Sequence, residues 1–152
     1  MTSRILPVLS IAAALCSTAA VAQDQNPAVA ARQSHMSLYA HNLGIIGGMA
    51  QGNTEYDAEM AATAATDLRM LAEISEQAYW PEGTDSESIE GTRALPAIWE
   101  DMEGFDASRA ALVEAAVAME EAAGESLEAL QGAMGGLGQG CGGCHQTYRQ
   151  QQ

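Results

Sequence analysis

Two cysteines and a histidine near the end of the chain have a spacing that can hold a metal-containing cofactor. Cys141 and Cys144 are three residues apart, and His145 follows at once in the run Cys-Gly-Gly-Cys-His. Residues three apart on a helix share one face, so both thiols can add to vinyl groups of the same porphyrin. The imidazole of His145 can then bind the iron as its axial ligand. The motif predicts one covalently attached haem c per chain.

Other chemistries also use closely spaced cysteines, and the rest of the sequence disfavours them. A thioredoxin-like redox pair belongs to a βαβ context, and the chain shows no strand pattern. A zinc site needs two further Cys or His ligands close by, and none is near. A disulfide is the usual interpretation of two cysteines in an exported protein, but the histidine directly after Cys144 favours haem attachment.

The first 22 residues have the composition of a secretory signal peptide. Arg4 gives a positive start, residues 5–16 form an apolar run too short to span a bilayer, and Ala20-Val21-Ala22 matches an A-x-A cleavage site. A buried core helix is the alternative interpretation of this run. Removal of the signal predicts a mature domain of residues 23–152 in the periplasm, with no membrane insertion remaining and with Cys16 lost.

Charge and composition limit the classes of protein to which the chain can belong. It has 152 residues with 20 acidic and 6 basic side chains, all of the latter Arg, and a formal net charge of −14. This charge excludes a nucleic-acid binder, which needs a basic face, and disfavours an anionic membrane surface as partner. Hydrophobic residues make up 47% of the chain, enough for one packed domain. The scarcity of aromatic residues favours helices over strands.

Four stretches place their inward residues three and four apart, which is the period of helices packed in a bundle. They are residues 27–51, about 55–79, about 105–123 and about 125–150. The side chains expected inside are Val29, Arg32, Met36, Tyr39, Leu43, Ile46 and Ala50; Met60, Ala64, Leu68, Leu71, Ile74 and Ala78; Phe105, Leu112, Ala115 and Met119; and Leu127, Leu130, Met134, Leu137, Cys141, Cys144 and Tyr148. Thr54 is expected to cap the second helix.

The lengths of these stretches predict the architecture. Helices of about 20 residues are each about 30 Å long and fit one antiparallel bundle. The first and last connections are short, which favours antiparallel neighbours. The sequence therefore predicts an all-α fold, an antiparallel up-down-up-down four-helix bundle, with covalent haem c on the C-terminal helix.

Seven glycines between positions 132 and 143 conflict with a helix in the last stretch. Each glycine costs about 1 kcal/mol relative to alanine inside a helix. A glycine-rich loop or tail is the alternative interpretation. The unbroken inward stripe favours a helix instead, and glycines would let a large flat ligand approach its backbone closely.

Several segments together resemble the cytochrome c′ family, in its c′/c-556 group. They are the terminal run Cys141 to Arg149, the first-helix run Arg32 to Met36, the run Trp80 to Thr84, and Ala97-Ile98-Trp99. The resemblance covers essentially the whole mature chain. It implies a periplasmic four-helix bundle, commonly a homodimer, with a five-coordinate high-spin haem whose one protein ligand is His145. It also implies an apolar distal pocket that admits NO and CO.

The resemblance assigns further residues to the haem surroundings. Gln33, Thr92 and Arg93 match positions that line the haem edge, and Arg149 matches one near the proximal imidazole, where a cation could tune the redox potential. A favourable charge at a helix C-terminus is the alternative role for Arg149. Arg32 interrupts an apolar stripe and needs an anionic partner if buried, which a haem propionate would supply. The alternative for Arg32 is an extended side chain that reaches solvent at the end of the bundle.

Met36 and Trp80 are expected on the distal side of the haem. Met36 could fill the pocket, or its thioether could bind the iron as a sixth ligand, as in the low-spin c-556 members of the family. Trp80 matches a distal aromatic position, and core packing explains it equally well. His35 and His41 lie off the inward stripe and are expected in solvent, as are the acidic side chains elsewhere.

Two functions follow as hypotheses. The first is electron transfer, in which the acidic surface steers the protein to a basic redox partner. The second is binding of NO or CO, which needs an open or displaceable sixth position on the iron. An enzyme such as a peroxidase is disfavoured, because it needs a distal acid–base group and the first-helix stripe offers Met36 there instead of a histidine.

Overall fold

The computed structural model describes residues 25–151 and contains four long helices. They are α1 (Pro27–Ala50), α2 (Ala58–Glu73), α4 (Met102–Ala123) and α5 (Leu127–Tyr148). Between α2 and α4 lie a short 3₁₀ turn, η1 (Gln77–Tyr79), and a single helical turn, α3 (Ala97–Glu100). The proposed signal peptide, residues 1–22, lies outside the described residues. Within residues 25–151, no helix is both long enough and apolar enough to cross a membrane.

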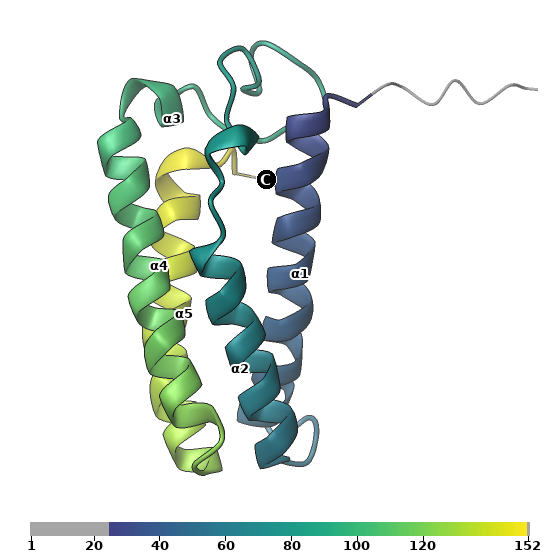
Figure 1. The fold of residues 1–152 in the computed structure, drawn as a ribbon, viewed down its shortest axis with the longest axis vertical. Coiled ribbons are helices and arrows are strands. Elements are labelled where there is room, and N and C mark those ends of the chain that lie inside the picture. Colours follow the sequence, from purple (N-terminus) through teal and green to yellow (C-terminus); the bar gives the residue numbers. More distant parts are fainter. Residues whose placement is uncertain (1–24, 152) are drawn as a thin grey trace, which may run out of the picture.

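The long helices alternate in direction along the bundle (Figure 1). Each packs on the helix before it, and α1 also packs on α5, so the four helices enclose one core. The start of α1, the end of α5 and the connection from α2 to α4 meet at one end of the bundle. The predicted antiparallel up-down-up-down four-helix bundle is therefore confirmed.

Polar side chains fix where the helices begin. Asn26 caps α1 ahead of Pro27, Asp101 caps α4, and Ser126 caps α5. Each accepts a hydrogen bond from a backbone N–H of the first turn, which would otherwise lack a partner. The prediction that Thr54 caps α2 is wrong, because Asp57 does so by accepting from Met60 N.

The predicted core is right in its centre and wrong on one face of α2. Leu68 and Leu71 are buried as expected, but Met60 is 50% exposed and Ile74 is 41% exposed. The alanines Ala61, Ala65 and Ala72, which were not expected inside, are buried, as is Ala64, which was. These small side chains let α2 approach its neighbours closely. The helical period predicted for α2 is confirmed, but the larger side chains Met60 and Ile74 lie outside the core.

Three other boundaries or faces differ from the sequence prediction. The second helix ends at Glu73 rather than near residue 79, because Ile74 takes an extended conformation. Leu127 is 36% exposed at the start of α5, and Met36 is 38% exposed on α1. Met36 borders the cavity described below, where inward-facing side chains are not covered by other protein atoms.

The glycine-rich segment is an unbroken part of α5. A Cβ at Gly140 would lie 3.2 Å from Leu112 Cα, so α4 approaches α5 closely at this point. At Gly132, Gly135, Gly136 and Gly138 a Cβ would meet no atom within 4 Å. Close approach within the chain therefore explains Gly140 but not the other four.

Two alanine substitutions in α5 test this distinction. Gly138→Ala should raise the free energy of unfolding by about 1 kcal/mol, the difference in helix propensity. Gly140→Ala should be less stable than Gly138→Ala by about 1 kcal/mol or more, since its methyl group would press on the backbone at Leu112. Urea unfolding of the two holoproteins, followed by circular dichroism, measures the difference. Equal stabilities would contradict the close packing at Gly140.

Candidate functional site

A cavity of about 490 Å³ lies between the four long helices and the connection from α2 to α4. Side chains of α1, α4 and α5 form its long walls, and residues 92–98 close one end. All nine residues predicted for the site line this cavity. Most of the remaining lining is apolar, which suits a large flat ligand with a few polar groups.

Helix α5 presents the cysteines and the histidine to this cavity. Cys141 and Cys144 are half-buried, and neither is in a disulfide. Burial raises the pKa of Cys141, and burial together with the charge of Glu76 raises the pKa of Cys144 to about 11. Burial and the positive charges of Arg149 and Arg93 lower the pKa of His145. His145 is thereby favoured as the neutral imidazole, the form that binds metal ions.

Arg32 is held against the cavity by neutral groups. Its side chain is 4% exposed and lies 4.8 Å from the centre of the Trp80 ring. Nη1 donates to Tyr79 O at 3.1 Å and to Thr84 Oγ1 at 2.9 Å, and Nη2 donates to Thr92 Oγ1 at 2.7 Å and to Thr84 O. Burial lowers the pKa of Arg32, although the charge of Asp85 opposes this.

This arrangement leaves a positive charge at the cavity wall. Within residues 25–151, no carboxylate forms an ion pair with Arg32. The side chain does not extend to solvent, which was one of the two alternatives for it. A fixed buried cation of this kind favours an anionic group on the ligand.

Three more predicted residues, Thr92, Arg93 and Arg149, come together where the end of the chain pairs with the connection before α3. Ala94 and Arg149 form an isolated antiparallel bridge, and Leu95 N donates to Tyr148 O at 3.0 Å. This pairing sets Thr92 and Arg93 beside the end of α5. Gln33, on the α1 side, donates to Gly91 O at 2.6 Å.

The cavity is rich in arginine although the chain is strongly acidic. Four of the five arginines in residues 25–151 line it: Arg32, Arg93, Arg109 and Arg149. Nε of Arg149 is buried and has no hydrogen-bond partner within the described part of the chain. An acceptor on a ligand would supply that partner.

Comparison with known proteins identifies the family. The family model described as Cytochrome C′ matches residues 27–149. The chain belongs to the cytochrome c′ family. Cytochrome c-554 from Cereibacter sphaeroides is 43% identical over 150 residues, which are 97% of this chain and 98% of that protein.

Solved structures agree with this membership. A cytochrome c′ from Rhodobacter sphaeroides superposes with a TM-score of 0.80 at 37% identity and covers 82% of this chain and 96% of its own. A nitric oxide complex of a variant of cytochrome c prime from Alcaligenes xylosoxidans has a TM-score of 0.71 at 31% identity and covers 82% and 94%. The predicted family is thus confirmed.

Members of the cytochrome c′ family carry covalently attached haem c, so the predicted cofactor is also confirmed. The residues present fit that group in three respects. Two free thiols and a neutral-favoured imidazole share one wall of the cavity. Arg149 has a buried nitrogen that finds no partner among residues 25–151. The arginine-rich lining suits the two negative propionates of a haem.

The lining of the cavity also contains Met36, Tyr39 and Leu43 from α1, and the aromatic residues Trp80 and Phe105. The Trp80 and Phe105 rings meet edge to face, with centroids 4.9 Å apart. Trp80 borders the cavity and packs in an aromatic cluster, which agrees with core packing, and its distal role stays a prediction.

The sequence analysis missed a buried polar cluster beside the cavity. His35 was expected in solvent but is 4% exposed, and Glu76 is 5% exposed, so both expectations are wrong. His41 is exposed, as expected. One signal could have found His35: it lies three residues after Arg32 and four before Tyr39, spacings that put it on the same side of the helix as these two inward residues.

Proposed function

We propose that the protein is a periplasmic electron carrier whose haem c is attached through Cys141 and Cys144, with His145 as axial ligand. The observation that supports this most is the cavity of about 490 Å³ with the two thiols and the imidazole on one wall. The haem supplies an iron that alternates between the ferric and ferrous states. A reversible one-electron couple in the purified holoprotein, measured by spectroelectrochemistry, would support the proposal, and its absence would refute it.

The surrounding residues have separate roles in this proposal. Arg32 and Arg93 neutralise the propionates, and Gln33 and Thr92 shape the edge of the site where these groups lie. Arg149 lies one turn after His145 and adds a positive charge near the imidazole, which favours the ferrous state electrostatically. The apolar walls exclude water from the iron.

We further propose that the iron is five-coordinate and high-spin and binds NO or CO on its distal face. Met36 then borders the distal face without binding the iron. One observation supports this: a variant of a relative forms a nitric oxide complex. The alternative is a low-spin carrier of the c-556 type, in which Met36 is the sixth ligand.

Absorption spectra of the holoprotein separate the two states. The expected result is a high-spin spectrum that shifts when CO is added to the ferrous protein. Met36→Leu should then leave the spectrum without CO unchanged, because leucine has a similar volume and no ligand atom. A low-spin spectrum indifferent to CO, which becomes high-spin in Met36→Leu, would establish Met36 as ligand and leave electron transfer alone.

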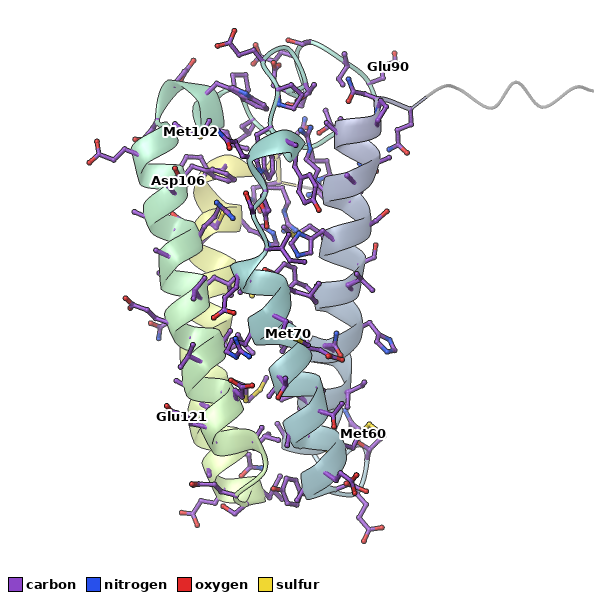
Figure 2. The ribbon with its side chains drawn as sticks, viewed as in Figure 1. Met60, Met70, Glu90, Met102, Asp106 and Glu121 are labelled. Atoms are coloured by element: carbon purple, nitrogen blue, oxygen red, sulfur yellow. The ribbon has the colours of Figure 1, made fainter. Side chains whose placement is uncertain are left out.

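The surface favours particular partners. The net charge of −14 favours a basic redox protein. Exposed apolar side chains on α1 and α2 include Leu38 at 52%, Met60 at 50% and Met70 at 48%, and the two methionines are labelled in Figure 2. We propose that this surface is covered in a homodimer. Sedimentation of the holoprotein should show a dimer, and Leu38→Glu should shift it towards the monomer.

A peroxidase function is not proposed. Peroxide turnover by the holoprotein should not exceed that of free haem, and a clearly faster rate would contradict this expectation.

A further inference from the structure

A buried charged cluster lies against the haem cavity and has no part in the function proposed above. It consists of His35 on α1, Glu76 in the connection after α2, and Arg109 on α4. His35 and Glu76 are almost completely buried, and Glu76 and Arg109 line the cavity. We call these three side chains the His35–Glu76–Arg109 cluster.

The contacts of the imidazole leave a place for one proton. Nε2 of His35 lies 3.1 Å from Leu71 O, and because a carbonyl only accepts, Nε2 carries a proton. Nδ1 of His35 lies 3.3 Å from Oε1 of Glu76, but among the residues that the structure describes it has no partner in hydrogen-bond geometry. In the neutral imidazole, the Nδ1 lone pair therefore faces a carboxylate oxygen. A second proton on Nδ1 converts this repulsion into attraction.

The carboxylate of Glu76 is held in place from its other side. Its Oε2 accepts a hydrogen bond from Trp80 Nε1 at 3.2 Å and lies 3.4 Å from Nε of Arg109. Arg109 in turn lies 3.5 Å from the exposed carboxylate of Asp106. These two contacts, both to Oε2, restrain the carboxylate while Oε1 lies near the imidazole of His35.

The aromatic rings around His35 carry no charge near neutral pH, whereas Arg32, three residues earlier on α1, is a buried cation that donates to Tyr79 O. On α1, the Tyr39 ring stacks on the imidazole at 4.9 Å, and in η1 the Tyr79 ring meets it edge-on at 5.8 Å. Burial and the charge of Glu76 raise the pKa of Tyr39, so its hydroxyl stays protonated. From α5, Cys141 lines the same cavity as Tyr39, and its sulfur would be a neutral thioether once haem is attached. The place for a further proton in the cluster is therefore Nδ1 of His35, beside Oε1 of Glu76.

We propose that the His35–Glu76–Arg109 cluster is a proton-binding site that couples haem reduction to the uptake of one proton. The inference rests on the proposed function, since it needs an iron that gains an electron in this cavity. The redox partner supplies the electron, solvent supplies the proton, and the new N–H bond forms at Nδ1 of His35. The electron lowers the charge of the cavity by one, and the proton restores it.

Linkage fixes the sign of the effect. Reduction favours the protonated cluster, so protonation must favour reduction by the same factor. Histidine changes charge between about pH 5 and 8. In this range the midpoint potential of the holoprotein should fall as the pH rises, by up to about 59 mV per pH unit, the limit for one proton per electron.

Two variants and a matched control test the assignment in the holoprotein. His35→Gln should lose more than half of this fall in potential. It should also take up fewer protons on electrochemical reduction, as measured by a pH indicator in weakly buffered solution. Glu76→Gln should move the pH-dependent range to lower pH, because the carboxylate that favours the imidazolium is gone. His41→Gln replaces an exposed histidine on the same helix and should behave as the wild type.

Each outcome bears on a different claim. A wild-type potential that does not change with pH overturns the inference without any variant, and so does a His35→Gln protein that keeps the full pH dependence. If His35→Gln loses its helical circular dichroism, the wild-type proton count and the Glu76→Gln shift decide the matter. The lack of a reversible one-electron couple would instead refute the proposed function.

Discussion

Replacing both Cys141 and Cys144 by alanine should release all the haem from the polypeptide in acid–acetone, whereas the wild type should release none. Both thiols line the cavity, and residues 25–151 contain no other cysteine that could form a thioether. Cys144→Ala alone should keep the haem on the polypeptide through one thioether. Haem that resists extraction in the double variant would contradict the attachment sites.

The same variant should change how stability depends on the cofactor. A covalently attached haem cannot dissociate, so the Tm of the wild type should not depend on added haem. In the double variant the haem becomes an ordinary ligand, and a 100-fold excess over its Kd stabilises the folded state by about 2.7 kcal/mol. Calorimetry with increasing haem should therefore raise the Tm of the variant only. A Tm equally insensitive to haem in both proteins would show that the cavity does not bind it.

Removing the imidazole of His145 should leave haem attached but change its electronic state. His145→Ala keeps both thiols, so acid–acetone should extract no haem. Axial ligands set haem potentials over a range of roughly 0.8 V, so a shift on the order of 0.1 V is expected together with an altered Soret band. Spectroelectrochemistry measures both quantities.

Two controls make the His145 experiment specific. Added imidazole should enter the space left by the side chain and restore much of the wild-type spectrum. Gln146→Ala changes the next residue, which is exposed, and should leave the spectrum unchanged. A wild-type spectrum in His145→Ala would refute the axial assignment.

The chemistry of the site could be read from the sequence because it is local. Cys141, Cys144 and His145 lie within about one turn of helix, so their relative placement needs only that the segment be helical. The glycines lower the helical propensity of that segment, but burial of Leu130 and Leu137 in the core stabilises it.

The architecture could also be read from the sequence. The four inward stripes, with short first and last connections, predicted the bundle, because each helix must bury its apolar face against another. The sequence did not determine which face of a helix points into the core where small and large side chains compete for that position. On α2, the stripe that contains Met60 and Ile74 has the helical period, but Ala61 and Ala72 allow the closer packing.

Only the tertiary structure decided the partners of the buried polar residues. Arg32 finds neutral acceptors in residues 79–92, more than 45 positions away in the chain. His35 is buried because Glu76 and Leu71 supply its contacts. A polar side chain can be buried only where other elements supply its hydrogen bonds or its counter-charge. Its own neighbours in the sequence therefore do not determine its place, whereas an apolar stripe or a local ligand motif carries that information in its own spacing.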